Sequence, residues 1–168
     1  MFLKTVLNLA IFAVILEVAF ACNGYKIKIL KAENCVEDPV ITIDPESTLK
    51  LNKKCELIPT GCIVNKGFKT AVSKFKATKD GIVVKEGKMD WCTMAKQVPE
   101  EVKSYAKVFG APTSCPVEES KICSDDKRID ISNYKSFLAL ARGNLVIDSN
   151  VEHDTGKSCF HIELEISK

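Results

Sequence analysis

The residues with the most chemical potential in this sequence are eight cysteines and two histidines. The cysteines stand at positions 22, 35, 55, 62, 92, 115, 123 and 159. An even number of cysteines in a small chain is typical of a disulfide framework. A zinc site fits poorly, because the chain has no CxxC pair and because His153 and His161 are not at the spacing of paired ligands. We therefore expect four disulfides, with no metal and no other cofactor.

Motifs of the common catalytic sites are not recognisable. The chain has no GxSxG, no HExxH and no phosphate-binding glycine loop. His161 falls on the polar side of an alternating stretch and His153 falls in a polar turn, so both histidines are expected to be solvated. The pair Asp125-Asp126 lacks the regularly spaced oxygen ligands of a calcium loop. We predict a protein that is not an enzyme.

The first 21 residues have the composition of a secretory signal peptide. Lys4 precedes a long apolar run that ends in Ala19-Phe20-Ala21, the small-x-small pattern of a cleavage site. A retained membrane anchor is one alternative, and Glu17 inside the run argues against it. A bacterial lipoprotein signal is another, but the box before the cysteine lacks the usual leucine. We predict a signal peptide at 1–21 and secretion to the extracellular space, with a lysosomal or other endomembrane lumen as a second destination.

Charge and composition narrow the possible partners. The chain has 24 Lys and Arg residues and 22 Asp and Glu residues, so its net charge is +2. No polybasic stretch indicates binding of nucleic acid. No repeat, linker or second hydrophobic segment divides the remainder. We expect one domain over residues 22–168.

The elements that must hold the cysteines are mainly strands. Alternation of apolar and polar residues, broken by turn residues, is typical of a β-sandwich or barrel. Asp80-Gly81 predicts a tight hairpin. The predicted strands cover 25–33, 40–43, 48–52, 67–78, 81–91, 137–149 with an interruption at Gly143, and 160–167, with Cys159 just before the last one.

One stretch, 99–110, has helical periodicity instead. Its apolar residues recur at i, i+3, i+4 and i+7, and they are Val102, Tyr105, Ala106 and Phe109. Such a short amphipathic helix between Cys92 and Cys115 has two interpretations. It either packs as a cover on the edge of the sandwich or forms a lid over an opening.

Three stretches together resemble the ML (lipid-recognition) superfamily, most closely its ganglioside-activator branch. They are ENC at 33–35, WC at 91–92 followed by a helical stretch and SCP at 114–116, and the C-terminal stretch 142–167. The resemblance implies an all-β fold, an immunoglobulin-like two-sheet β-sandwich of the lipid-cup type with one short amphipathic helix. Members of that superfamily bind and transfer lipids and are not enzymes.

The resemblance also implies part of the disulfide pairing. Cys35 would pair with Cys159, which fastens the last strand to the start of the domain, and Cys92 would pair with Cys115 around the helix. In CELIPTGC, Cys55 and Cys62 can close a local loop across a Pro-Thr-Gly turn. Cys22 and Cys123 then remain as the fourth pair.

In this fold the apolar side of the last strand would face inward, between the sheets. A dry core is the ordinary outcome for such a face, but the resemblance favours a cavity. The large side chains expected to line it are Phe68, Phe75, Tyr105, Phe109, Phe137, Leu138, Leu140, Leu145, Phe160, Ile162 and Leu164. Lysines 69, 74, 76 and 79 either border the opening and meet anionic headgroups or solvate a face.

Two classes of function follow. The first is a secreted protein that binds or transfers a lipid or another small hydrophobic ligand, with transient contact to a membrane surface or receptor. The second is a cysteine-stapled interaction module, such as a protease inhibitor or venom-type protein, that acts through an exposed loop. Residues 55–62 are the best candidate for such a loop.

Overall fold

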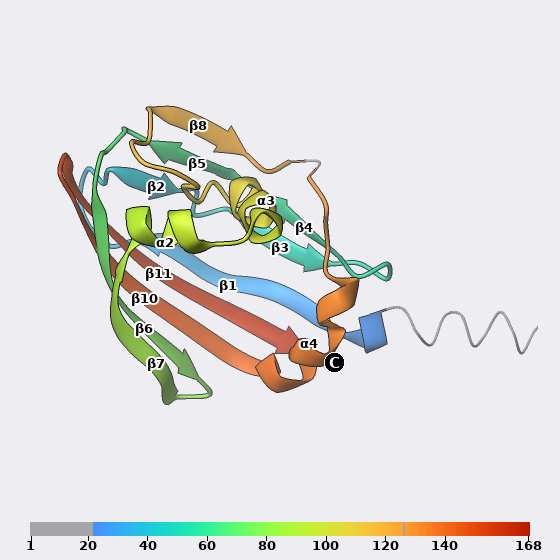
Figure 1. The fold of residues 1–168 in the computed structure, drawn as a ribbon. Coiled ribbons are helices and arrows are strands. Elements are labelled where there is room, and N and C mark those ends of the chain that lie inside the picture. The colour runs from blue at the N-terminus through green and yellow to red at the C-terminus, as the bar shows by residue number, and fades with distance from the viewer. Residues whose placement is uncertain (1–21, 126) are drawn as a thin grey trace, which may run out of the picture.

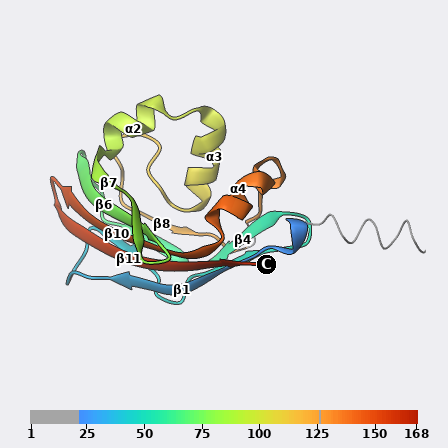
Figure 2. The same ribbon diagram turned by 90° about the horizontal axis from the view of Figure 1, so that it is seen from below.

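The computed structural model describes residues 22–125 and 127–168, so the predicted signal peptide at 1–21 lies outside the described residues. One large antiparallel sheet forms a curved layer, and two smaller sheets and three short helices lie over one of its faces (Figures 1 and 2). The predicted disulfide-stapled β-sandwich is confirmed. The prediction of a single helix was wrong, because three α-helices accompany the strands.

The large sheet has the strand order β1 (Lys26–Asn34), β11 (Gly156–Ser167), β10 (Gly143–His153), β6 (Ala71–Lys79), β7 (Ile82–Asp90). The smaller sheets are β2 (Ile41–Ile43), β5 (Cys62–Asn65), β8 (Ser120–Cys123), and β3 (Thr48–Leu51), β4 (Glu56–Thr60), β9 (Ile129–Asp130). The helices are α2 (Trp91–Gln97), α3 (Glu100–Val108) and α4 (Lys135–Ala141), with single 3-10 turns η1 (Cys22–Gly24) and η2 (Ser132–Tyr134).

Strand β11 is an interior strand of the large sheet, which explains its regular alternation. It pairs with β1 on one side and with β10 on the other. Leu164 lies opposite Ile29 on β1 and opposite Leu145 on β10. Because side chains alternate across a strand, these residues share one face with Phe160 and Ile162. We call this apolar face of the large sheet the inner face.

The hairpin between β6 and β7 forms where it was predicted. Asp80 and Gly81 both have positive φ, 49° and 82°. Two consecutive residues of this kind are what a two-residue turn needs to match the twist of its strands.

The predicted strand at 137–149 was wrong in its first half. Residues 135–141 form helix α4, and the strand begins only at Gly143, whose φ is 125°. The sequence KSFLALA is rich in the helix formers Leu and Ala, and only Leu138 within the helix is buried. Helix α2 was also not predicted, although its first residues carry a signal. The Asp90 carboxylate accepts a hydrogen bond from the Thr93 amide at 2.9 Å, which is an N-cap.

All eight cysteines form disulfides in the described residues. The structure pairs Cys35 with Cys159 and Cys92 with Cys115, as the resemblance implied. The other two expected pairs, Cys55–Cys62 and Cys22–Cys123, were wrong. The bonds are instead Cys22–Cys55 and Cys62–Cys123.

The extended conformation of β4 explains this correction. Cys55 precedes β4 and Cys62 begins β5, so the chain between them runs out as a strand instead of turning back. Seven extended residues span about 20 Å, whereas the Cα atoms of a disulfide lie within about 7 Å. Cys62 faces Cys123 directly across the β5–β8 pairing, with a Cα–Cα distance of 4.0 Å.

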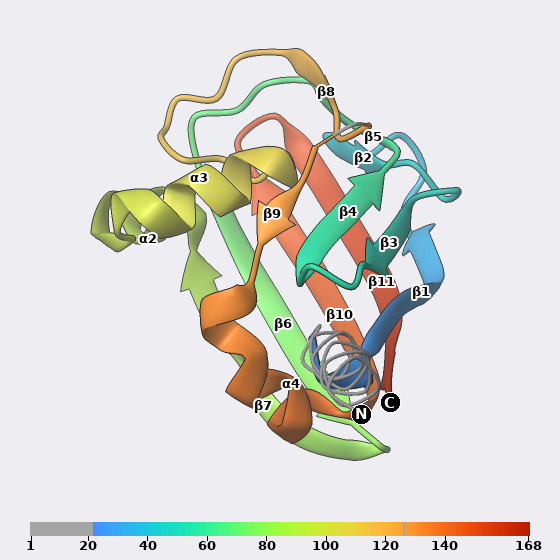
Figure 3. The same cartoon turned by 90° about the vertical axis from the view of Figure 1, so that its right-hand side faces the viewer.

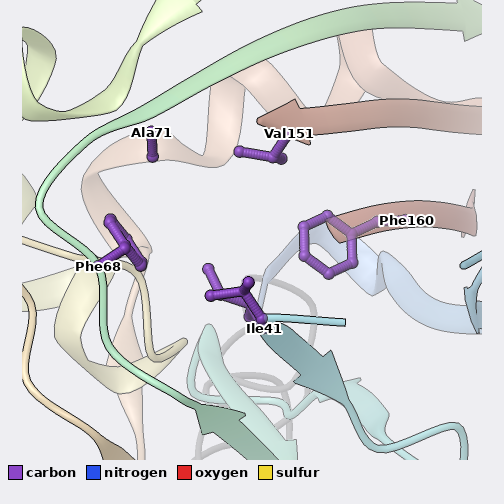
Figure 4. Packing of buried hydrophobic residues seen from close by; sticks show 6 residues of the cluster. Ile41, Phe68, Ala71, Val151 and Phe160 are labelled. Carbon is purple, nitrogen blue, oxygen red and sulfur yellow. The ribbon is translucent and has the colours of Figure 1, made fainter. Parts of the chain in front are cut away.

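Buried apolar side chains form two separate clusters. The first lies where β2 crosses the large sheet, and Figure 4 shows Ile41, Phe68, Ala71, Val151 and Phe160 turned toward one another. We call this the closed end of the inner face. The second cluster gathers Leu138 of α4 around the Cys22–Cys55 disulfide, with Tyr25, Ile27 and Leu51 packed against it.

Candidate ligand-binding cavity

The middle of the inner face, between the two clusters, is incompletely covered. Ile147 lies in the centre of β10, opposite Ile162 and Ala77, and alternation places it on the same face as buried Val151. Its side chain is nevertheless 37% exposed. An apolar residue in the centre of a sheet is normally covered by the opposing layer. The opposing layer therefore leaves a gap over this part of the sheet.

A cavity of about 190 Å³ lies between the large sheet and the two smaller sheets. Its lining is mainly apolar and comes from both layers: Ile29, Ala32, Ile43, Leu49, Pro59, Ile63, Phe109 and Ile162, with Ser47, Thr48, Thr60, Gly61 and Ser124 at its polar edge. We call it the inter-sheet cavity. Its apolar lining from two layers agrees with the resemblance to lipid cups, but its volume is below the roughly 300 Å³ expected of a ligand cavity.

A second hollow of about 240 Å³ lies beside helices α2 and α3. Its walls are almost entirely apolar, and they are Met89, Trp91, Met94, Ala95, Val98, Ala106, Ala111 and Pro112, with Lys103 and Thr113 as the polar members. We call it the helix hollow. Flexible methionine side chains and the indole ring form a surface that adapts to ligands of different shape.

Helix α3 borders both spaces. Ala106 lines the helix hollow, and Phe109, just after the helix, lines the inter-sheet cavity. No residue of α3 is buried, although its apolar residues follow a helical period. The Cys92–Cys115 disulfide closes the base of the segment that carries α2 and α3. The helix is therefore a weakly packed cover that is tethered at its base.

The C-terminal end of α3 sits close to the smaller sheet because of one glycine. Gly110 has a φ of 63°, and a Cβ atom there would lie 3.1 Å from the Ile63 side chain. The hydroxyl of Ser124 donates a hydrogen bond of 2.6 Å to the Val108 carbonyl. These contacts hold Phe109 over the inter-sheet cavity.

The structure brings together only some of the residues predicted to line a cavity. Phe109 and Ile162 line the inter-sheet cavity. Phe75, Leu145 and Leu164 lie half-buried on the inner face, outside both spaces.

The remaining predicted residues lie in cores or on the surface. Phe68 and Phe160 belong to the closed end, and Leu138 belongs to the second cluster. Tyr105 stacks edge to face on Tyr134, with ring centroids 6.5 Å apart. Phe137 and Leu140 are exposed on α4. The sequence reasoning missed Trp91 and Met94, which the Asp90 N-cap and the helical spacing that follows would have identified.

The lysines expected at a rim are divided between the two faces. Lys74 and Lys76 alternate with Phe75 on β6, so they lie on the outer face of the large sheet and are exposed. Lys79 lies at the end of β6 and forms an ion pair with Asp80 at 3.6 Å. Lys74 and Lys76 therefore solvate a face and do not border the cavity.

The two histidines lie in opposite environments. His153, expected in a solvated turn, ends β10 on the inner face and packs on Phe68 with ring centroids 4.5 Å apart. Burial lowers its pKa, and its Nδ1 atom has no hydrogen-bond partner among the described residues. His161 lies on the outer face, as predicted. Hydrogen bonds to Asp148 at 2.7 Å and Glu163 at 2.9 Å raise its pKa.

The loop proposed for an inhibitor does not form. Residues 56–60 are strand β4, which pairs with β3 on one side and with β9 on the other. A paired strand in mid-sheet cannot insert into a protease cleft as a free loop. Residues 55–62 therefore do not supply the exposed loop that the protease-inhibitor hypothesis requires.

Neither a metal-binding cluster nor a membrane-spanning helix is found among residues 22–125 and 127–168. No group of three or more His, Cys, Asp and Glu side chains is arranged to hold a metal ion there. No described helix is long and apolar enough to cross a membrane.

Comparison with known proteins identifies a relative. No protein-family model matches the chain. A curated protein of the mosquito Anopheles gambiae, named sporozoite-associated mosquito saliva protein 1, is 36% identical over 154 residues. The match covers 89% of this chain and 85% of the relative. The chain belongs to the family of this saliva protein. The relative is a saliva protein, and the four disulfides of this chain agree with an extracellular protein.

Proposed function

We propose that this member of the saliva-protein family is a non-enzymatic carrier that binds a lipid or another small hydrophobic ligand, with the fold of the ML superfamily. The observation that supports it most is the gap in the middle of the inner face. Apolar side chains from two layers surround an empty space there, and Ile147 remains exposed beside it. Concave, mostly apolar sites with a few polar groups at the edge are typical for small-molecule ligands.

The position of α3 gives the carrier a route of entry. The helix has no buried residue, it borders both apolar spaces, and a hydrogen bond from Ser124 holds its C-terminal end. A small outward movement of α3 would join the inter-sheet cavity to the helix hollow. The joined space would accommodate a longer apolar chain than either space alone.

The relative's name supports a salivary setting for this chain. We propose that the protein is secreted into saliva, where disulfides protect a small domain from unfolding. A carrier in such a fluid would bind a hydrophobic compound of the host or of the secreting animal.

Native mass spectrometry of the secreted protein, before and after organic extraction, tests the proposal directly. We expect a bound mass in the small-molecule range that extraction removes. Displacement of a fluorescent fatty-acid probe then locates the site. A32L adds volume to the wall of the inter-sheet cavity, and A95L adds the same volume to the helix hollow.

We expect A32L to weaken probe binding about tenfold or more while A95L has a smaller effect, since loss of space for one or two methylene groups costs about 1–2 kcal/mol. Absence of both a bound mass and probe binding in the wild-type protein would overturn the carrier function.

A further inference from the structure

Five large apolar side chains are exposed at one end of the molecule. Three follow the β6–β7 turn directly, and their exposed fractions are 71% for Ile82, 49% for Val83 and 57% for Val84. Two more lie on α4, where Phe137 is 60% exposed and Leu140 is 74% exposed. We call these five residues the hairpin-tip patch. Exposed apolar residues that gather at one end of a protein indicate an interaction site.

Hydrogen bonds hold the two parts of the patch at the same end. The amide of Asn144 donates to the Asp80 carboxylate at 2.8 Å, and the Asp80 amide donates to the Asn144 carbonyl at 2.8 Å. Gly143 permits this approach, because a Cβ atom there would come within 2.4 Å of the Asp80 carboxylate. Figures 1 and 3 show α4 and the β6–β7 turn at this end of the large sheet.

Basic side chains accompany the patch. Lys85 follows Val84 on β7 and Arg142 follows α4, both are exposed, and neither takes part in an ion pair among the described residues. The nearby carboxylates lie beside other lysines. Asp80 pairs with Lys79, and Glu86 faces Lys76 across the hairpin. The charges near the patch that have no ion-pair partner among the described residues are therefore those of Lys85 and Arg142, and they are positive.

The shape of the patch indicates what covers it. Ile82 and Val83 are consecutive residues of a strand, so they project to opposite faces of the hairpin. A rigid protein partner, including a second copy of this chain, covers one face at a time. A fluid medium surrounds both faces of an inserted tip at once.

We propose that the hairpin-tip patch docks the protein on the surface of an anionic phospholipid membrane. Ile82 and Leu140 enter the interfacial layer, and Lys85 and Arg142 meet lipid phosphates. Docking of this kind rests on the proposed carrier function for its biological role. It would bring the open part of the inner face to a source of lipid. The patch itself is separate from both cavities.

Co-sedimentation of residues 22–168 with vesicles tests the docking. We expect binding to vesicles of phosphatidylserine and phosphatidylcholine, and weaker binding to phosphatidylcholine alone. I82S and L140S should each lower the partition coefficient about tenfold or more, as removal of one inserted aliphatic side chain does. The matched control I122S changes an exposed apolar residue of β8, at the far edge of the fold, and should bind like wild type.

Charge variants separate the contribution of the basic side chains to vesicle binding from that of the apolar ones. The double variant K85E/R142E should lose binding to the anionic vesicles and retain the weak binding to neutral ones. Its control, K121E on β8, makes a charge reversal away from the patch and should change little.

Three results would overturn the docking proposal. They are no binding of the wild-type protein to anionic vesicles, equal binding of I82S and I122S, and a concentration-dependent dimer that I82S dissociates. Displacement of the fatty-acid probe in the absence of vesicles reports on the cavity independently. I82S should retain probe binding and A32L should retain vesicle binding, so failure of one proposal is distinguishable from failure of the other.

Discussion

The closed end and the middle of the inner face belong to the same strands, yet they are packed differently. At the closed end, β2 lies across the sheet and Phe160, Val151 and Phe68 are buried against it. Only a few residues further along β10 and β11, Ile147 is exposed and Ile162 lines a cavity. Strand alternation is the same in both regions. What differs is how closely the smaller sheets cover the large one. They pack against it at the closed end and leave a cavity in the middle, where Phe109 forms part of the wall.

The comparison indicates that one sheet face can supply stability and a binding site side by side. Apolar residues contribute fully to the free energy of unfolding only where a second layer covers them. Where the cover is incomplete, the same residue types form a surface for a ligand. The two regions should therefore respond differently to the same kinds of substitution.

Removal of a disulfide should have the largest effect, and the effect should be greater for the bond that closes the longer loop. Cys35 and Cys159 are 124 residues apart, whereas Cys92 and Cys115 are 23 apart. From loop entropy, replacing the first pair by Ser should cost about 4–5 kcal/mol of unfolding free energy and replacing the second about 3 kcal/mol. Urea denaturation measures both. A greater loss for the shorter loop would show that α2 and α3 stabilise the sandwich more than their packing suggests.

Truncation of a buried aromatic residue at the closed end and of an exposed one elsewhere should give the next largest difference. F160A removes a buried ring at the closed end and should cost about 3–5 kcal/mol. F137A removes an exposed ring on α4 and should stay within about 0.5 kcal/mol of wild type. Thermal or urea unfolding of the pair checks this. Equal losses would contradict the tight packing of Phe160 at the closed end.

Phe109 should behave as a ligand contact more than as a core residue. It lines the inter-sheet cavity and is still partly exposed, so F109A should cost about 1 kcal/mol of stability. The same change should weaken binding of the fatty-acid probe by about 1–3 kcal/mol. A stability loss of about 3–5 kcal/mol, without a change in probe binding, would instead place Phe109 in a solid core.

The smallest effect should be on the pH dependence of stability, and its sign should differ between the two histidines. Burial lowers the folded-state pKa of His153 below 6.5, so its contribution is complete above pH 6.5 and is lost as the pH falls. Hydrogen bonds to Asp148 and Glu163 raise the folded-state pKa of His161 above 6.5. Its contribution is complete below pH 6.5 and is lost as the pH rises through the raised value.

Urea midpoints at pH 5 and pH 7.5 measure the two contributions. H153Q should reduce the loss of stability on acidification, and H161Q should increase it. Identical profiles for both variants would show that the histidine environments do not differ in solution.

The sequence predicted those features that depend on local periodicity or on turn chemistry. Alternation located β1, β6, β7 and β11, and Asp80-Gly81 located the hairpin, because both signals depend on neighbouring residues. Strand β10 was joined wrongly to α4, because KSFLALA has apolar content but no period that separates a short helix from a strand. The Cys22–Cys55 and Cys62–Cys123 bonds depend on which strands become neighbours, and spacing along the chain does not contain that information.

The candidate site was less predictable than the fold for a related reason. Phe68 and Phe109 are equally apolar, and only the presence of a covering layer makes one a core residue and the other a cavity wall. Coverage is a property of the assembled layers. The helical period at 99–110 correctly predicted α3, but its lack of burial emerged only in three dimensions.

The interior position of β11 has a consequence for biosynthesis. Residues 156–167 are made after every other strand of the large sheet, and β1 and β10 have no contact across the sheet until they arrive. The Cys35–Cys159 bond likewise requires a residue made very late. The large sheet is therefore completed only after all its other strands have been synthesised. Its completion requires an oxidant for the disulfide and protection of the two exposed strand edges until β11 arrives. A chain interrupted before residue 156 would display those edges, and cellular quality control should retain it instead of secreting it.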